Sequence, residues 1–184
     1  ARGSGMGKKS HPHLKTLAHF ASTSEDINTL SIARCVKTAV EHVWLPDVQS
    51  IVDELDEKAH RYRSRPLLSL THGQPATPTT LGKELAVYVR RLERQLRHVR
   101  EQEYLGKING ATGTFGAHMA AIPEVDWIEA SRYFVTERMG LTWNPLTTQI
   151  ESHDWQAELY GTISHVNRIL HNLAVDVWMY ISHG

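Results

Sequence analysis

The stretch LGKELAVYVRRLERQLRHVREQEYL, residues 81–105, decides the fold. Its apolar side chains recur in steps of four, three, four and three positions at Leu85, Val89, Leu92, Leu96 and Val99, and many of the positions between them are Arg, Glu or Gln. This pattern predicts a long amphipathic helix with a narrow apolar seam. Such a seam has to pack against other helices.

The ends of this helix carry recognisable signals. Thr77 followed by Pro78 fits a helix start, with threonine as the cap and proline at the first helical position. Gly106 fits the end, because glycine commonly follows the last helical residue.

Helical spacing recurs along most of the chain. We expect further helices over about residues 26–43, from Pro46 onward, over about residues 127–138, and from Asp154 to about Tyr180. No stretch shows convincing strand alternation, and no internal repeat is present. The expected fold class is therefore all-α, in the form of a long-helix bundle.

Composition excludes several classes of partner. Acidic and basic residues are equal in number at 20 each, so bulk charge selects neither nucleic acid nor a membrane surface. No apolar run approaches the roughly 20 residues that span a bilayer. The single cysteine, Cys35, cannot form an internal disulfide, which favours a reducing, cytoplasmic compartment. Its apolar neighbours predict that Cys35 is a small buried side chain.

The two ends of the sequence differ in character. Residues 1–10 are mostly Gly, Ser, Lys and Arg, and we expect a flexible lead or a cloning remnant there. The pair His11 and His13 has no matching carboxylate or cysteine cluster, so we expect no metal site. Helical spacing still continues at Val177 and Ile181, which suggests a piece of a longer protein.

Four polar segments lie between the expected helices. They are rich in hydroxyl, amide and glycine residues and cover residues 22–26, 71–77, 109–114 and 147–149. Loops held by rigid helices are common places for binding sites. His72 could exchange a proton near neutral pH, but the chain has twelve histidines, so its residue type alone is a weak signal.

These segments also have structural interpretations. Hydroxyls in residues 22–26 suit a carboxylate or phosphate site at a helix start, yet simple helix capping is their commoner use. The glycines of residues 110–116 do not form a P-loop, and indicate either close helix approach or ligand contact. Lys107 and Asn109 either hydrogen-bond a ligand or complete a helix.

Together, these segments resemble the fumarase/aspartase superfamily, and within it the adenylosuccinate lyase family. Residues 23–28 (TSEDIN) resemble its Thr-Ser-x-Asp-x-Asn motif, and residues 71–78 (THGQPATP) resemble the motif around its catalytic histidine. Residues 107–113 (KINGATG) and 143–151 (WNPLTTQIE) are similar to the bacterial members. The resemblance covers nearly all of residues 14–183, and four motifs in the same order are far more specific than any one.

The resemblance implies an activity and roles for five residues. Adenylosuccinate lyases cleave adenylosuccinate to AMP and fumarate by anti elimination, and release fumarate in the same way from succinyl-aminoimidazole carboxamide ribotide in purine synthesis. His72 matches the family's general acid. Thr23 and Ser24 match residues that hold the succinyl portion. Gln149 matches a substrate-binding glutamine, and Thr71 flanks the histidine in the pocket wall. The resemblance implies no cofactor.

Other parts of the family pattern are absent from this sequence. They are the Gly-Ser-Ser-x-Met-Pro-x-Lys-x-Asn loop that carries the base serine, the amino-terminal Asn-His-Asp region and the carboxy-terminal domain. Residues 11–184 therefore resemble the first part of the central helical domain, and we expect the isolated fragment to be inactive. Family active sites form where three subunits of a homotetramer meet, so the expected partners are further copies of the chain and a nucleotide substrate.

Two alternatives remain open from the sequence. The first is another fumarate-releasing member of the superfamily, such as argininosuccinate lyase or fumarase. Those enzymes share the Thr-Ser and Thr-His features, but not the combination of residues 72–77 with residues 147–149. The second alternative is a helical assembly fragment with no catalytic role.

Overall fold

A computed structural model describes residues 19–183 of the chain. They form two compact units, one of residues 19–34 and 104–152 and one of residues 35–103 and 153–183. The expected lead at residues 1–10 and the pair His11 and His13 lie outside the described residues.

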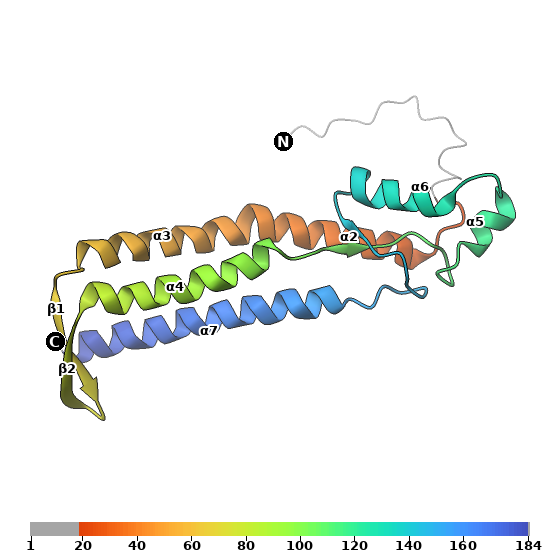
Figure 1. The fold of residues 1–184 in the computed structure, drawn as a ribbon. Helices are drawn as coiled ribbons and strands as arrows, with labels where there is room; N and C mark the ends of the chain where they lie inside the picture. Colours follow the sequence, from red (N-terminus) through yellow and green to blue (C-terminus); the bar gives the residue numbers. More distant parts are fainter. Residues whose placement is uncertain (1–18, 184) are drawn as a thin grey trace, which may run out of the picture. The chain divides into compact units, whose positions relative to one another are not determined.

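Three long helices build the second unit. They are α3 (Leu45–Arg61), α4 (Leu81–Arg100) and α7 (Asp154–His183), which lie side by side in Figure 1. α4 packs against both α3 and α7. A π-helical turn, η1 (Val40–Trp44), leads into α3 from α2 (Ser24–Ala39), within which the boundary between the two units falls.

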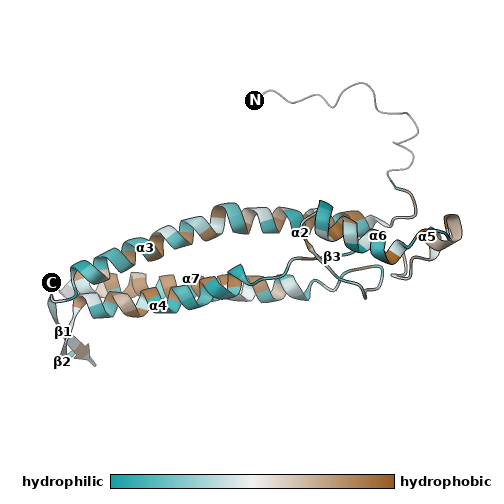
Figure 2. Cartoon of the chain, turned by 45° about the horizontal axis from the view of Figure 1, so that its top comes forward, coloured by the Kyte–Doolittle hydropathy of each residue, from teal (hydrophilic) through white to brown (hydrophobic). Residues whose placement is uncertain are grey.

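The seam of α4 forms the centre of this bundle, as the sequence predicts. Leu92 and Leu96 are completely buried, whereas Leu85 is only half-buried. The helices on either side complete the core with Val48, Val52, Val166 and Ile169. Hydrophilic and hydrophobic residues alternate along α3 and α4 in Figure 2, as expected for helices that bury one face and solvate the other.

The predicted start of α4 is wrong. The helix begins at Leu81, and the side chain of Thr80 caps it by accepting a hydrogen bond from the backbone N–H of Lys83. Thr77 and Pro78 belong instead to a β-strand. The cap is therefore a threonine, as the sequence predicts, but it is Thr80 and not Thr77.

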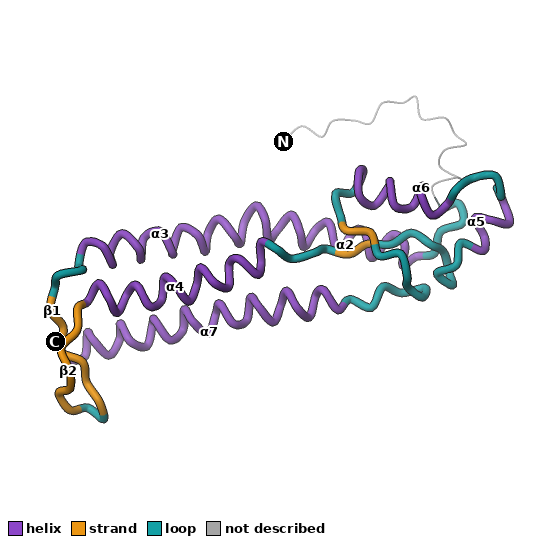
Figure 3. Tube along the Cα trace, in the orientation of Figure 1, coloured by secondary structure: helices purple, strands orange, loops and turns teal. Residues whose placement is uncertain are grey.

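An antiparallel hairpin connects α3 to α4, and its existence contradicts the prediction that the chain has no strands. β1 (Pro66–Thr71) pairs with β2 (Gln74–Thr80), with a bulge between Leu68 and Leu70. Figure 3 shows the hairpin at the end of the bundle where α3 ends and α4 begins. Most of its side chains are exposed, so neither strand needs the alternation that marks a half-buried sheet.

The first unit combines short elements around the start of α2. They are β3 (Leu105–Gly106), α5 (Gly116–Ala121), α6 (Trp127–Tyr133), the π-helical turn η2 (Phe134–Arg138) and β4 (Thr142–Trp143). β3 and β4 pair in parallel. Leu30, Ala33, Val135 and Leu141 are buried in this unit.

Gly106 does not end α4, as was predicted, because the helix ends at Arg100. The glycine lies in β3, where a Cβ atom would stand 2.7 Å from the side chain of Leu30. Close packing against α2 therefore explains the glycine at this position.

The all-α fold class is confirmed, with the hairpin as its main exception. The prediction for Cys35 is wrong, since its side chain is exposed. Ala33 faces the core, and two positions turn a helix by about 200°, which carries Cys35 to the opposite side. Within the described residues, no helix is long and apolar enough to cross a membrane.

The bundle core supplies a stability prediction. Leu96→Ala deletes a completely buried side chain, so we expect the free energy of unfolding to fall by about 2–5 kcal/mol. Urea denaturation of the full-length protein measures this change. The matched control is Arg94→Ala on the exposed face of α4, which should change the value by less than about 0.5 kcal/mol. Equal effects of the two substitutions would contradict the assignment of the core.

Candidate active site

The start of α2 is held by an aspartate in its first turn. The backbone N–H of Thr23 donates to Oδ2 of Asp26 at 2.9 Å, the backbone half of a capping box. The hydroxyl of Thr23 accepts a hydrogen bond from the side-chain amide of Gln149 at 2.9 Å. Two of the residues predicted to bind substrate, Thr23 and Gln149, are therefore brought together in the first unit.

Asp26 also joins α2 to the segment around Asn109. Its two carboxylate oxygens accept hydrogen bonds from the backbone N–H groups of Asn109 at 3.1 Å and Gly110 at 3.2 Å. Nζ of Lys107 lies 2.7 Å from Oδ1, and neither side chain of this ion pair is exposed. The lysine contact has the distance of an ion pair without the direction of a hydrogen bond. One buried carboxylate thus receives three N–H groups and a cation.

A third segment joins the same cluster through Asn109. The side-chain amide of Asn109 donates to the hydroxyl of Thr147 at 2.7 Å, and that hydroxyl donates to the carbonyl oxygen of Thr148 at 2.9 Å. Residues 23–26, 107–110 and 147–149 consequently form one hydrogen-bonded group.

Two glycines allow these segments to approach. Gly110 has a φ of +81°, a conformation that side-chain-bearing residues rarely adopt. Gly113 has a φ of +72°, and a Cβ atom there would lie 2.1 Å from the carbonyl oxygen of Thr147. The glycine-rich segment therefore allows two loops to approach closely, whereas the sequence interpretation was close approach of helices.

The exposed side of this group carries polar atoms. Ser24 is exposed at the start of α2, and Gln149 is exposed on the loop that follows β4. A depression of about 490 Å³ runs along the same loop, lined by Asn144, Leu146, Thr147, Thr148, Ile150 and Ser152. The arrangement offers hydroxyl and amide groups beside free N–H groups at a helix start, a combination that suits a carboxylate ligand.

His72 and Thr71 belong to the second unit, where they lie at the tip of the hairpin. Thr71 pairs with Gln74, which leaves His72 and Gly73 as a two-residue turn. Both turn residues have positive φ, +50° for His72 and +73° for Gly73, as a type I′ turn requires. Histidine is one of the few residues enriched in this region. The side chain of His72 is exposed.

A buried histidine lies beside the hydrogen-bonded group around Asp26. His118 on α5 is 3% exposed and packs against the rings of Phe115 and Trp127, with ring centroids 5.6 and 4.9 Å away. Burial lowers the pKa of His118, and the negative charge of Asp26 opposes this shift. A cavity of about 230 Å³ adjoins the ring and is lined mainly by aromatic residues, among them Phe20 and Phe134.

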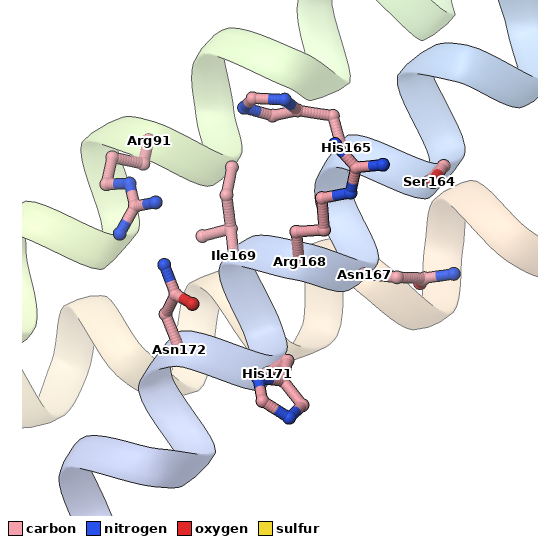
Figure 4. A pocket seen from close by; sticks show the side chains of 8 residues that line it. All are labelled: Arg91, Ser164, His165, Asn167, Arg168, Ile169, His171 and Asn172. Carbon is pink, nitrogen blue, oxygen red and sulfur yellow. The ribbon is translucent and has the colours of Figure 1, made fainter.

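Another groove lies in the second unit, between α4 and α7. It measures about 590 Å³ and is lined by Arg91, Ser164, His165, Asn167, Arg168, Ile169, His171 and Asn172. Figure 4 shows Arg91 and Asn172 pointing toward one another from the two helices. None of the residues predicted from the sequence to bind substrate lines this groove.

Sequence reasoning missed the organising role of Asp26 and Lys107, and the burial of His118. Asp26 was recognised only as part of a motif, although an acidic residue at the third helical position is itself a capping signal. A lysine inside the glycine-rich KINGATG segment was a second signal, because a charged residue there needs a partner if it is buried. Nothing in the sequence distinguishes His118 from the other histidines.

The profile of a family described as lyase matches residues 3–184. The chain belongs to this lyase family. It is 54% identical over 164 residues to the adenylosuccinate lyase of Escherichia coli strain K12, and 49% identical over 166 residues to that of Vibrio cholerae. These alignments cover 89% and 90% of the chain and 36% of each relative. The superfamily resemblance expected from the four motifs is thereby confirmed, and the chain spans little more than a third of these relatives.

A solved structure supports the fold of this family. The crystal structure of a fumarate lyase from Mesorhizobium sp. BNC1 matches with a TM-score of 0.76 at 21% identity, over 90% of this chain and 38% of that one. At this identity the match shows the fold alone.

The buried histidine supplies a prediction about pH. Because the pKa of His118 is lowered from 6.5, the unfolded chain takes up a proton below about pH 6.5 that the folded chain excludes. Stability should therefore fall as the pH falls through that value, and should not depend on His118 above it. Melting temperatures between about pH 8 and about pH 5 measure the slope.

Two variants test the assignment of this slope. His118→Gln should flatten it, whereas His98→Gln, on an exposed position of α4, should retain the parental slope. A His118→Gln protein whose stability falls as steeply as the parent's would show that other groups cause the dependence.

Proposed function

We propose that the full-length protein is an adenylosuccinate lyase, which eliminates fumarate from adenylosuccinate to give AMP and from succinyl-aminoimidazole carboxamide ribotide. The observation that carries this proposal is the 54% identity with the Escherichia coli enzyme across nearly all of the chain. The polar group around Thr23 and Gln149 supports it, since both residues match substrate-binding positions of that family.

The reaction is an anti elimination that breaks one carbon–nitrogen bond. A base removes a proton from the carbon beside a carboxylate of the succinyl group, and the electron pair is delocalised into that carboxylate as a dianion. The pair then forms the double bond of fumarate as the carbon–nitrogen bond breaks, and an acid protonates the departing nitrogen. In our proposal the base lies outside this chain, and His72 is the acid.

The hairpin geometry supports the role of His72. The side chain is exposed at a tight turn. Thr71 and Gln74, the residues on either side of the two-residue turn, pair with each other in the hairpin, so the backbone that carries the imidazole is restrained. Histidine is the side chain that most often transfers protons in enzyme catalysis. Thr71, immediately before it, would contribute to the wall of the pocket.

The start of α2 would bind the succinyl carboxylates. Ser24 offers an exposed hydroxyl in the first turn, and the first N–H groups of a helix have no partners within the helix. The positive end of the helix dipole favours anions there. Thr23 and Gln149 would complete the contact from the two adjacent segments.

The remaining properties follow from the same proposal. The protein would act in purine nucleotide synthesis in the cytoplasm and would form a homotetramer whose active sites combine residues of several subunits. Exposed apolar side chains on the last turns of α7 support association, with Trp178 68% and Ile181 75% exposed. Stripes of this kind on a helix commonly mark interfaces between chains.

Assaying fumarate release tests the proposed activity. The full-length protein should release fumarate from adenylosuccinate, and should be far less active with argininosuccinate or malate. Release from argininosuccinate or malate instead would assign the protein to another branch of the superfamily. Absence of release from all three would favour a non-catalytic assembly role.

The assignment of the acid gives a kinetic prediction. In the full-length protein, His72→Gln should lower kcat at least about a hundredfold while KM changes less, because the acid acts mainly in the transition state. His98→Gln on α4 serves as the control and should retain the parental kcat. Near-parental turnover of His72→Gln, with intact folding, would show that another group donates the proton.

The assembly gives a separate prediction. Light scattering of the full-length protein at about micromolar concentration should give the mass of four chains, because the exposed apolar stripe of α7 needs a partner surface. A monodisperse monomer would overturn the proposed composite sites.

A further inference from the structure

We propose that Asp26 and Lys107 are positioning residues of the candidate active site, and that Lys107 also cancels the charge of Asp26 so that the start of α2 can accept substrate carboxylates. This inference rests on the proposed function, because it assumes an anionic substrate at Thr23 and Ser24. Neither residue was assigned a role from the motifs.

The Asp26 carboxylate holds separate segments of the chain in place. It receives the backbone N–H of Thr23 from its own helix, and those of Asn109 and Gly110 from a segment far away in the sequence. The positions of Thr23 and Asn109 in turn fix the loop that carries Gln149, through the hydrogen bonds to Gln149 and Thr147. All three segments are thus located relative to one carboxylate.

Lys107 also determines the net charge at the start of α2. Asp26 lies in the first turn of α2, close to Thr23 and Ser24, where an unpaired carboxylate would repel a dicarboxylate ligand. Burial excludes the water and salt that screen surface charges. Nζ of Lys107, at 2.7 Å, supplies the compensating charge from within the protein. The pair is therefore neutral as a whole and leaves the helix start attractive to anions.

Substitution of Lys107 tests the proposed cancellation of charge. Lys107→Met removes the cation and leaves the Asp26 carboxylate unpaired. We expect KM for adenylosuccinate to rise by at least about tenfold, because the substrate carboxylates would then meet an uncompensated negative charge. The double variant Asp26→Asn/Lys107→Met is uncharged at both positions, so it should recover part of the lost affinity.

The recovery separates positioning from simple stability. If the pair only stabilises the fold, the double variant should bind substrate no better than Lys107→Met, and both should show parental KM per folded site. The double variant also protects the test against misfolding, because it buries no unpaired charge. Arg132→Met provides the matched control. It breaks an exposed ion pair with Glu129 in the same unit and should leave KM unchanged.

The experiment is steady-state fumarate release by the full-length protein and its variants, with the folded fraction measured by circular dichroism. A raised KM in Lys107→Met that is partly restored in the double variant supports the inference. Parental KM in Lys107→Met, or a double variant at least as impaired, overturns it. A parental protein that releases no fumarate contradicts the proposed function instead, so the two failures are distinguishable.

Discussion

The buried ion pair between Asp26 and Lys107 is the constraint on which the first unit depends. Neither side chain reaches solvent, and removing one partner of such a pair typically costs about 3–5 kcal/mol, because the other charge is left buried and alone. Replacing a buried ion pair by apolar side chains often leaves the stability of a fold unchanged, so stability alone seldom requires such a pair. Its presence at the start of a helix, with three backbone N–H groups directed at one carboxylate, is better explained by the need to locate those segments accurately.

The second unit solves a different positioning problem with apolar packing and a tight turn. The buried seam of α4, centred on Leu92 and Leu96, fixes this helix against its neighbours. The hairpin that enters α4 then presents His72 at a turn whose backbone is restricted by pairing on both sides. A catalytic group benefits from such restraint, because a general acid has to meet its proton acceptor at hydrogen-bond distance. Helix packing thus supports the loops on which the proposed chemistry depends.

The sequence predicted those features that arise from local periodicity. The seam of α4, the start of α7 at Asp154 and the helix from Trp127 are all visible as three- and four-residue steps. The hairpin of residues 66–80 was missed because its exposed strands have no buried face, and therefore no alternation to detect. The burial of Cys35 was wrong for a related reason, since apolar neighbours in a helix do not specify which side faces the core.

The candidate site was predictable only in part. Thr23 and Gln149 were found through motifs, and the structure joins them by a hydrogen bond. The pairing of Asp26 with Lys107 could not be deduced, because nothing local to either residue specifies a contact with a segment so distant in the chain. For Gly113 the sequence left close helix approach and ligand contact open, and the partner that it approaches, the carbonyl of Thr147 in a loop, is again a tertiary contact. Contacts between loops are therefore the part of the site that required a structure.

Hydrogen–deuterium exchange of the full-length protein, read by mass spectrometry over residues 20–27 and 107–113, tests the organising role of Asp26 most directly. The amides of Asn109 and Gly110 lie outside any helix or strand, and each donates a hydrogen bond to the buried carboxylate of Asp26. The account predicts slow exchange at the amides of Thr23, Asn109 and Gly110 in the parental protein, and simultaneous loss of that protection in Asp26→Ala, which removes the acceptor that the three amides share. Rapid exchange of residues 107–113 in the parental protein, or loss of protection in one segment without the other, would contradict it.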